Sequence, residues 1–218
     1  MEALLAERRR RLDAGERSLG WKLGFGTGTA MERLGIDAPL IGWLPASARL
    51  EPGATAAVSP WSAARLEPEI AVHLGADVPA GAACEEAAEA VAAVGTAIEL
   101  VEPDPDAADP EAILRANIFH RHVVLAAPDG DRRTADGVIV RVLRNGAEEA
   151  GTEDPRALTG DHLDLVRHVA DTLAGFGERL GAGEVVITGS TVPALAVAAG
   201  DEVEVEMPPL AALRVGFR

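Results

Sequence analysis

Apolar residues in this chain are gathered into short runs, and the most regular of these runs predict strands. The stretch 65–75, RLEPEIAVHLG, opens with charged residues and continues into isoleucine, valine and leucine, which is typical of a buried strand. The stretch 94–101, VGTAIELV, has the same character. A third run, 184–191, EVVITGST, predicts a strand that ends in a small polar turn. Residues 138–151 contain Asn145-Gly146 between two short runs, which indicates a hairpin with a type I′ turn.

Helical spacing is strongest over 159–180, where leucine, valine and alanine recur on one stripe and Asp161 stands near the start. His162 and His168 are six residues apart and do not share a helix face, so we predict that both are ordinary surface residues. Cys84 falls at the start of an alanine-rich segment, and nothing beside it marks it as a nucleophile. Shorter helices are predicted over 1–12, 30–34 and 85–93.

Length and composition restrict the class of protein. A chain of 218 residues with 48% hydrophobic content is long enough to bury one sizeable core, and we predict one catalytic domain, 1–218, with a short helical segment at 1–19. The net charge of −15, with acids scattered along the chain, argues against nucleic acid as a partner. A single cysteine and no apolar run of membrane-spanning length favour a cytoplasmic protein without a membrane partner. Arginines 8–11 form a basic run, but neighbouring acids dilute it, so attachment to an anionic surface is not favoured.

Two glutamates in the first strand are the main candidates for chemistry. Glu67 and Glu69 are separated by one residue, so on a strand they point to the same face with Cα atoms about 6.6 Å apart. Two carboxylates on an otherwise apolar strand repel each other unless they share a proton or a cation lies between them. Oxygen ligands suit Mg²⁺, Mn²⁺ or Ca²⁺ better than zinc, and Glu99 in the next strand offers a third carboxylate. The simpler alternative is that the pair only solubilises an edge strand.

Lys22 is a second candidate, in the glycine-rich segment 20–29, GWKLGFGTGT. Tryptophan, leucine and phenylalanine surround the lysine, so partial desolvation would suit it to acid-base work or to holding a carboxylate. A lysine whose stem lies on apolar surface with its amine in water is the alternative. The glycine spacing, G-x-G-x-G without an acid about 20 residues later, disfavours a dinucleotide site.

Three further segments carry polar groups. His120 and His122 can share a strand face, but no third nitrogen or sulfur ligand is near in sequence, so zinc is not favoured. The acidic, proline-rich segment 102–109 is predicted to be a solvated loop, with an active-site lid as the alternative. Thr188, Gly189 and Ser190 form a turn that can present hydroxyls and a backbone N–H to an anion.

Five blocks in this order, GWKLGFGT, MERLGIDAPLIGWL, RLEPEIAVHLG, AIELVEPD and AGEVVITGS, resemble the fumarylacetoacetate hydrolase superfamily. The resemblance runs from about residue 20 to the C-terminus and is strongest to the 2-keto-4-pentenoate hydratases and 4-oxalocrotonate decarboxylases. It implies an α+β fold: a mixed β roll or sandwich of the fumarylacetoacetate hydrolase C-terminal type, with flanking helices and a short N-terminal helix. It also implies a homo-oligomer, dimer or higher, and a role in aromatic catabolism.

The resemblance implies roles for particular residues. Glu67, Glu69 and Glu99 match the family's Mg²⁺ ligands, with Mn²⁺ as an alternative ion. Lys22 matches the lysine of the G-[YW]-K block, a catalytic and substrate-binding group, and Glu69 is expected to take part in catalysis as well as in metal binding. The turn Thr188-Gly189-Ser190 matches the T-G-S substrate loop, and Asn117 matches a substrate-binding asparagine. His120 is a candidate catalytic acid or base. The implied activity is a lyase, hydratase or decarboxylase, that acts on a small 2-oxo acid through a metal-stabilised enolate.

The chain departs from the family pattern in three places. Its N-terminal helical region is shorter than in the hydratases, the loop 102–109 has no counterpart, and in the block 117–120, NIFH, only Asn117 of the asparagine and serines is kept. No histidine precedes His73, whereas hydrolytic members use a His-Glu pair in an N-terminal lid, so a lyase is favoured over a hydrolase. The alternatives are an acylpyruvate-type C–C hydrolase or oxaloacetate decarboxylase, and a non-catalytic paralogue that binds a partner protein or a small acid.

Overall fold

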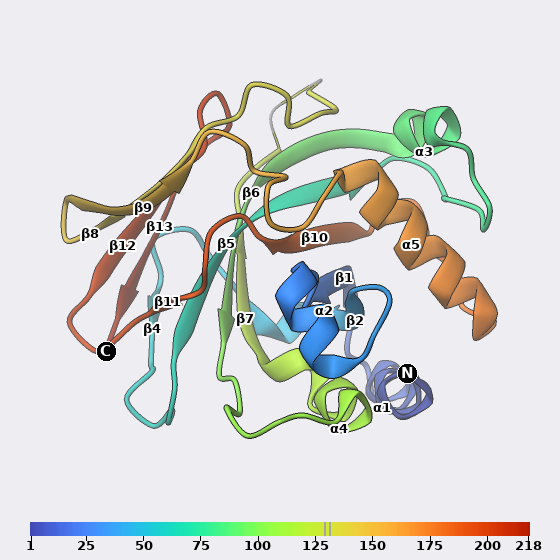
Figure 1. The fold of residues 1–218 in the computed structure, drawn as a ribbon, viewed down its shortest axis with the longest axis horizontal. Coiled ribbons are helices and arrows are strands. Elements are labelled where there is room, and N and C mark those ends of the chain that lie inside the picture. The colour runs from blue at the N-terminus through green and yellow to red at the C-terminus, as the bar shows by residue number, and fades with distance from the viewer. Residues whose placement is uncertain (129, 131) are drawn as a thin grey trace.

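The strands of the chain are arranged in two sheets, and the computed structural model describes residues 1–128, 130 and 132–218 (Figure 1). Within these residues, eight strands form the larger sheet in the order β2-β1-β10-β5-β6-β7-β3, with β11 paired to β5. The smaller sheet has the order β4-β13-β12-β8-β9. In the described part of the chain, five α-helices flank the larger sheet or join its strands.

The larger sheet contains β1 (Ser18–Gly24), β2 (Leu40–Pro45), β3 (Arg49–Leu50), β5 (Arg65–Leu74), β6 (Val91–Val101), β7 (His120–Leu125), β10 (Val185–Ser190) and β11 (Leu195–Ala196). The smaller sheet contains β4 (Thr55–Ala56), β8 (Val140–Arg144), β9 (Ala147–Thr152), β12 (Glu202–Glu206) and β13 (Leu213–Phe217). The helices are α1 (Glu2–Asp13), α2 (Gly28–Leu34), α3 (Cys84–Ala90), α4 (Pro110–Arg115) and α5 (His162–Gly175). Two 3₁₀ turns, η1 (Ala46–Ala48) and η2 (Asn117–Phe119), complete the described elements.

The long antiparallel pair β5 and β6 forms the centre of the larger sheet. Both strands are rich in β-branched and apolar residues, which fit a pleated surface that is buried on both faces. Their register places Glu67 directly opposite Glu99 and Glu69 opposite Ala97. The three predicted glutamates therefore meet on one face because of this register.

The larger sheet curls into a roll. The two strands at the ends of its order, β2 and β3, are joined in the chain only by η1, so the polypeptide passes from one edge of the sheet to the other. The inner face of the roll carries a small apolar cluster from several strands. The glutamates share this inner face, so they lie above an apolar floor. The buried members of the cluster are Leu44, Ala71, Ala97, Val123, Leu125, Val185 and Ile187.

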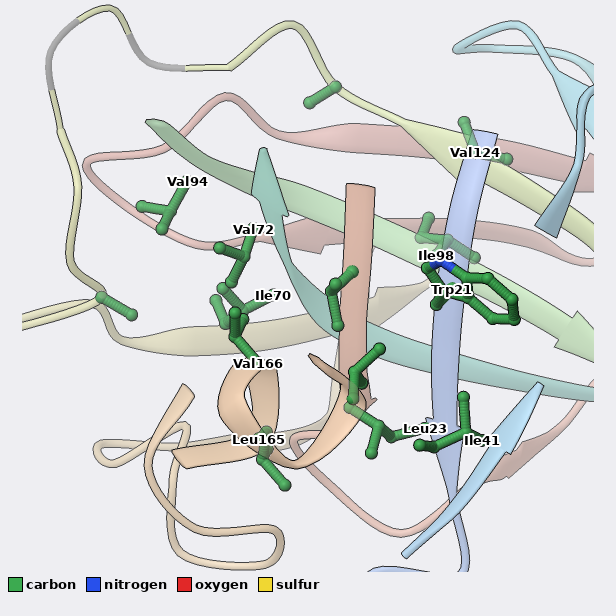
Figure 2. Packing of buried hydrophobic residues seen from close by; sticks show 14 of the residues in the cluster. Trp21, Leu23, Ile41, Ile70, Val72, Val94, Ile98, Val124, Leu165 and Val166 are labelled. Carbon is green, nitrogen blue, oxygen red and sulfur yellow. The ribbon is translucent and has the colours of Figure 1, made fainter. Parts of the chain in front are cut away.

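Helix α5 covers the outer face of the roll. Figure 2 shows Val166 of α5 beside Ile70 and Val72 of β5, and all three side chains are buried in the main core. Asp161 caps the helix by accepting a hydrogen bond from Leu163 N at 2.9 Å. The same core includes apolar residues of both sheets, which holds the sheets together.

Helix ends and one histidine differ from the sequence predictions. The helix predicted over 159–180 is confirmed only over His162–Gly175, and the alanine-rich helix ends at Ala90 because the next residue already pairs with Leu74 in the sheet. His162 was predicted to lie on the surface, and this prediction is wrong, since only 8% of the residue is exposed. The bounds of the two helices and the burial of His162 depend on contacts with neighbouring elements. Sequence periodicity carries no information about these contacts.

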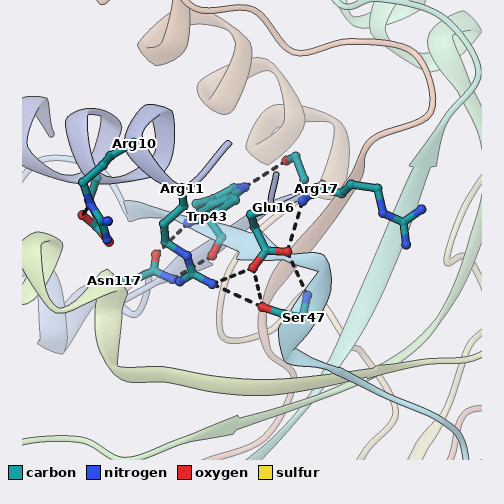
Figure 3. A network of polar contacts seen from close by, with 9 residues as sticks. Arg10, Arg11, Glu16, Arg17, Trp43, Ser47 and Asn117 are labelled. Atoms are coloured by element: carbon teal, nitrogen blue, oxygen red, sulfur yellow. Dashed lines mark hydrogen bonds and ion pairs between the residues drawn. The ribbon is translucent and has the colours of Figure 1, made fainter. Parts of the chain in front are cut away.

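The N-terminal arginine run makes intramolecular contacts. Arg8 and Arg9 pair with Glu178, Arg10 pairs with Glu7, and Arg11 pairs with Glu16. Figure 3 shows Arg11, Glu16 and Ser47 in one network beside the ring of Trp43. Among these contacts, the hydrogen bond from Ser47 does most to lower the pKa of Glu16, to about 2. The pairs with Glu178 connect α1 to the segment that follows α5, and each arginine of the run has an acidic partner within the chain.

None of the helices in the described part of the chain has the length and apolar character needed to cross a bilayer.

Candidate metal centre and substrate cavity

The three glutamates form a compact group at one end of the roll. Glu67 and Glu69 come from β5 and Glu99 comes from β6, and one carboxylate oxygen of each lies within 4.8 Å of the others. Glu69 and Glu99 are fully buried, while Glu67 is half-buried and lines a cavity. No other group of three or more metal-ligating side chains meets this criterion among the described residues. The predicted triad is therefore assembled as the spacing and register require.

Burial raises the pKa values of the two β5 glutamates. Burial is the main cause of the raised pKa of Glu67, to about 7, and the nearby charge of Glu99 adds to the shift. The pKa of Glu69 is also raised, first by burial and then by the charges of Glu99 and Glu67. In the absence of a cation, these carboxyls hold protons at a pH where an exposed glutamate has lost its proton.

Glu99 differs because two basic groups contact it. Lys22 Nζ of β1 forms a buried ion pair with Glu99 Oε1, and His120 Nδ1 lies 2.6 Å from the same oxygen. Burial alone would raise the pKa of Glu99, but Lys22 and His120 outweigh burial and hold this pKa below its usual value. Burial lowers the pKa of His120 despite the neighbouring carboxylate. The site thus contains one firmly ionised carboxylate next to two carboxyls that tend to keep protons.

Unpartnered oxygens show that the group fits a hard cation. Glu69 Oε2 accepts a hydrogen bond from Gly189 N at 2.7 Å, but Glu69 Oε1 and Glu99 Oε2 are buried and have no hydrogen-bond partner within the described structure. Buried polar atoms are nearly always satisfied, so two orphaned carboxylate oxygens in one cluster indicate a missing ligand. Three carboxylates are a ligand set suited to Mg²⁺, Mn²⁺ or Ca²⁺.

A left-handed turn holds Lys22 in place. Asn117, Ile118 and Phe119 have φ angles of 50°, 51° and 60°, a conformation that non-glycine residues rarely adopt in succession. The turn directs Ile118 O toward Lys22 Nζ, which donates a hydrogen bond to it at 3.2 Å. The lysine stem is packed so closely that a Cβ added to Gly42 would lie 2.9 Å from Lys22 Cγ. Strained segments of this kind often mark functional sites.

The Asn117 amide fixes this turn to β2 with one accepted and one donated hydrogen bond. Its Oδ1 accepts from Trp43 N at 2.7 Å and its Nδ2 donates to Trp43 O at 2.8 Å (Figure 3). The side chain does not line the cavity described below. Substrate contact by Asn117 stays a prediction, and the structure gives its side chain a positioning role.

The Thr188-Gly189-Ser190 segment closes one side of the triad at an irregular end of β10. Gly189 has a φ of 88°, which favours glycine, and its N–H points to Glu69. Thr188 Oγ1 donates to Ile70 O at 3.2 Å on the buried side and does not line the cavity. Ser190 lines the cavity while its hydroxyl donates to Val192 O at 2.6 Å. Of the three predicted substrate contacts, the structure leaves Gly189 and Ser190 beside the cavity.

A cavity of about 290 Å³ lies beside the triad, and Glu67 is the member of the triad that lines it. Its wall is mainly apolar and includes Phe25 and Phe119, whose rings meet edge to face with centroids 6.4 Å apart. Glu67 and Arg65 are the charged residues among the described residues that line it. Pockets of this size and character suit small organic molecules with one or two charged groups.

The two strand histidines have separate partners. His120 contacts Glu99, whereas His122 Nδ1 lies 3.3 Å from Ala48 O and its ring stacks on Trp61 with centroids 5.9 Å apart. A register shift between Leu100 and Val101 in the pairing of β6 with β7 accompanies this divergence. The two histidines therefore do not form a common nitrogen site.

Fold and site together define a β roll that carries an oxygen-ligand metal centre beside a small cavity. The family model for the fumarylacetoacetate hydrolase C-terminal domain matches residues 23–218, so the chain belongs to the fumarylacetoacetate hydrolase family. This confirms the predicted family and the α+β roll.

The chain is similar to several characterised enzymes. It is 27% identical over 206 residues to a 4-oxalocrotonate decarboxylase of a Pseudomonas species. The aligned region covers 93% of this chain and 80% of the relative. The chain is 28% identical over 215 residues to the 2-hydroxyhexa-2,4-dienoate hydratase of Comamonas testosteroni, with 94% and 80% covered. The structure of 4-oxalocrotonate decarboxylase from Pseudomonas putida, complexed with magnesium and adipate, superposes with a TM-score of 0.90 at 23% identity, over 99% of this chain and 83% of that one. These relatives are lyases of the predicted hydratase and decarboxylase branch.

Arg65 is a charged residue of the cavity wall for which no role was predicted from the sequence. It lies two residues before Glu67 on the same strand, so the i, i+2 rule that linked the glutamates also places Arg65 on their face. This spacing could have identified Arg65 from the sequence, because it places a cationic side chain on the same strand face as Glu67 and Glu69.

Proposed function

We propose that this protein is a Mg²⁺-dependent lyase that acts on a small 2-oxo acid, as a hydratase of the 2-hydroxypenta-2,4-dienoate type or as a decarboxylase. The observation that carries the proposal is the pair of buried, unpartnered oxygens of Glu69 and Glu99 beside a cavity large enough for such an acid. The names of the relatives, decarboxylases and hydratases of unsaturated 2-oxo acids, support the same class.

Glu67, Glu69 and Glu99 are proposed to hold the cation, with Mn²⁺ as a possible substitute for Mg²⁺. A divalent ion bound there would supply Lewis-acid stabilisation of negative charge on the substrate's oxygens. Hydrogen bonds within the protein orient two of the carboxylates. Gly189 N donates to one oxygen of Glu69, and Lys22 and His120 contact one oxygen of Glu99. Each of these two carboxylates is thereby left with one oxygen free to bind the ion.

Lys22 and His120 are the proposed proton-handling groups. Lys22 Nζ is buried and bonded to Glu99 and to Ile118 O, so its position beside the triad is fixed. His120 Nδ1 is bonded to Glu99, and its buried Nε2 has no partner among the described residues. An imidazole with one nitrogen oriented by a carboxylate and the other free has the arrangement required of a general acid or base. Glu69 is proposed to contact the reacting atoms as well as the ion.

Binding of oxalate, a mimic of the enolate of pyruvate, tests the proposal. Isothermal titration calorimetry is carried out with Mg²⁺ and after removal of metal with a chelator. Binding that requires Mg²⁺ is the expected result, and turnover of 2-hydroxydienoates and 2-oxo acids is then followed by product analysis. Release of CO₂ identifies a decarboxylase, and addition of water to the diene identifies a hydratase. Absence of oxalate binding under both conditions contradicts the proposal.

Three wider features are also proposed: a cytoplasmic location, a role in aromatic catabolism, and assembly as a homo-oligomer, dimer or higher. The first two follow from the absence of a membrane-spanning run and from the resemblance to catabolic hydratases. Light scattering of the purified protein tests the third, and a mass of 22.6 kDa would show a monomer instead.

A further inference from the structure

A second cavity lies at the start of helix α5, away from the three glutamates. It has a volume of about 150 Å³ and is formed where the N-terminal end of α5 meets β5, β6 and the segment 133–136. Among the described residues, none lines both this cavity and the substrate cavity. A ligand in one of them therefore leaves the other free.

The floor of this second cavity is apolar. Val72 and Val94 contribute to it and stand directly opposite each other in the pairing of β5 with β6. A cavity of about 150 Å³ lined by apolar side chains is large enough to bind a benzene ring. The apolar residues that line it are Val72, Val91, Val94, Ala135 and Leu163.

His162 adds one unsatisfied polar group to the wall of this cavity. It is the first residue of α5, only 8% of it is exposed, and its buried Nε2 has no hydrogen-bond partner within the described structure. Buried polar atoms are nearly always satisfied, so this nitrogen marks a place for one further polar partner. Burial is the main cause of the lowered pKa of His162, so the imidazole is neutral at pH 7 and can share a hydrogen bond with a hydroxyl group in either direction.

The charged residues around the cavity do not favour an ionic ligand. Arg156 Nη1 lies 3.1 Å from Asp136 Oδ1 and 3.8 Å from Asp161 Oδ2, so its guanidinium is already paired with acids of the chain. Arg133 is the second arginine of the described lining, and the two arginines balance the two aspartates in charge. The cavity therefore fits a neutral molecule better than a carboxylate or an amine.

We propose that this cavity is a binding site for a small neutral aromatic alcohol, with the ring on the apolar floor and the hydroxyl group bonded to His162 Nε2. Ligand sites commonly combine an apolar lining with a few polar groups that fix orientation. Phenol, a benzene ring with one hydroxyl group, is the simplest molecule of this class. The site is separate from the proposed metal centre, so its test is independent of the proposed function.

The test is a titration of the metal-free protein with phenol and with toluene, in which a methyl group replaces the hydroxyl group. Methyl signals of valine and leucine in the NMR spectrum report both the affinity and the place of binding. His162→Leu removes the ring nitrogen and keeps an apolar side chain, and His162→Gln restores a hydrogen-bonding group. His168→Leu is the matched control, because His168 belongs to the same helix but contacts Pro39 O at 2.9 Å and does not line the cavity.

Phenol should bind the unmodified protein saturably and shift the methyl signals of Val72, Val91, Val94 and Leu163. His162→Leu should weaken phenol by about fivefold or more and change the affinity for toluene by less than about twofold, since only phenol loses a hydrogen bond. His162→Gln should recover part of the phenol affinity, and His168→Leu should bind both ligands as the unmodified protein does.

Three results would overturn the proposal. One is the absence of saturable phenol binding, which would mean that the cavity holds water only, and this result needs no variant. Another is an equal loss of phenol and toluene in His162→Leu. The third is displacement of phenol by Mg²⁺ and oxalate together, which would place phenol in the substrate cavity. A protein that binds phenol as expected but does not bind oxalate would contradict the proposed function and leave this site intact.

Discussion

The glutamates of β5 and the glutamate of β6 lie in one site but in opposite electrostatic environments. Glu99 is surrounded by Lys22 and His120, which keep it ionised, whereas Glu67 and Glu69 have no cationic side chain bonded to them within the described structure. Burial consequently raises the pKa of both β5 residues, while the pKa of Glu99 is lowered. The comparison indicates that the chain itself neutralises the β6 side of the centre and leaves the β5 side for a bound cation.

The largest effect is expected from Glu99→Gln. This change removes the metal-binding carboxylate and leaves Lys22 buried without its charge partner. Breaking a buried pair from one side costs about 3 to 5 kcal/mol, so the metal-free protein should lose that much free energy of unfolding yet remain folded. Mg²⁺-dependent oxalate binding should fall below detection. Urea denaturation and calorimetry measure the two quantities.

Glu102→Gln is the control for Glu99→Gln. Glu102 follows β6 and is bonded to Arg121, but this pair is near the surface and lies outside the triad. The control should change the free energy of unfolding by no more than about 1 kcal/mol and leave oxalate binding intact. Unchanged Mg²⁺-dependent binding in Glu99→Gln would show that the three glutamates are not the metal ligands.

Glu69→Gln separates the two sides of the site. Metal-dependent oxalate binding should again be lost, but the metal-free variant should have a larger free energy of unfolding than the unmodified protein at a pH above the raised pKa of Glu69, as urea denaturation measures. The reason is that Glu69 has a raised pKa in the folded state, so its ionisation at high pH opposes folding, and the amide cannot ionise. The amide carbonyl of the substituted side chain can still accept the hydrogen bond from Gly189 N. A loss of stability as large as that of Glu99→Gln would mean that the two sides do not differ.

Much of the β5 side could be predicted from the sequence. Alternation on a strand has a period of two, so the spacing of Glu67 and Glu69 fixes their common face without knowledge of the rest of the fold. Glu99 was named from its position in an apolar run, but its place opposite Glu67 depends on the register of β6. Strand register is set by packing and turns elsewhere in the molecule, so the local sequence around Glu99 does not predict it.

The surroundings of Glu99 were predicted only in part. The predicted desolvation of Lys22 and its suitability for holding a carboxylate agree with the structure. The carboxylate that Lys22 meets depends on the parallel pairing of β1 with β10, which brings the lysine to the triad. The contact of His120 with Glu99 depends on the left-handed turn 117–119, and three consecutive non-glycine residues of this conformation have no sequence signature. The burial of His162 was missed for a similar reason, since helix periodicity does not say what covers each face. Long-range contacts therefore determined the position of Glu99 and of the residues around it, while local spacing determined only the common face of Glu67 and Glu69.

The smallest expected effect concerns pH and sharpens the comparison within the unmodified protein. Metal binding requires ionised carboxylates, and the pKa of Glu67 in the metal-free site is about 7, with that of Glu69 also raised. The apparent affinity for Mg²⁺ should therefore rise by about tenfold between about pH 6 and about pH 8, with release of protons that calorimetry in two buffers of different ionisation enthalpy can count. In the metal-free protein the sign is reversed: stability conferred by a raised carboxyl pKa is present at low pH and is lost as pH rises through that pKa. Added Mg²⁺ should accordingly raise the melting temperature more at about pH 8 than at about pH 6. Binding that is independent of pH, with no proton released, would show that Glu67 and Glu69 are already ionised before the cation arrives.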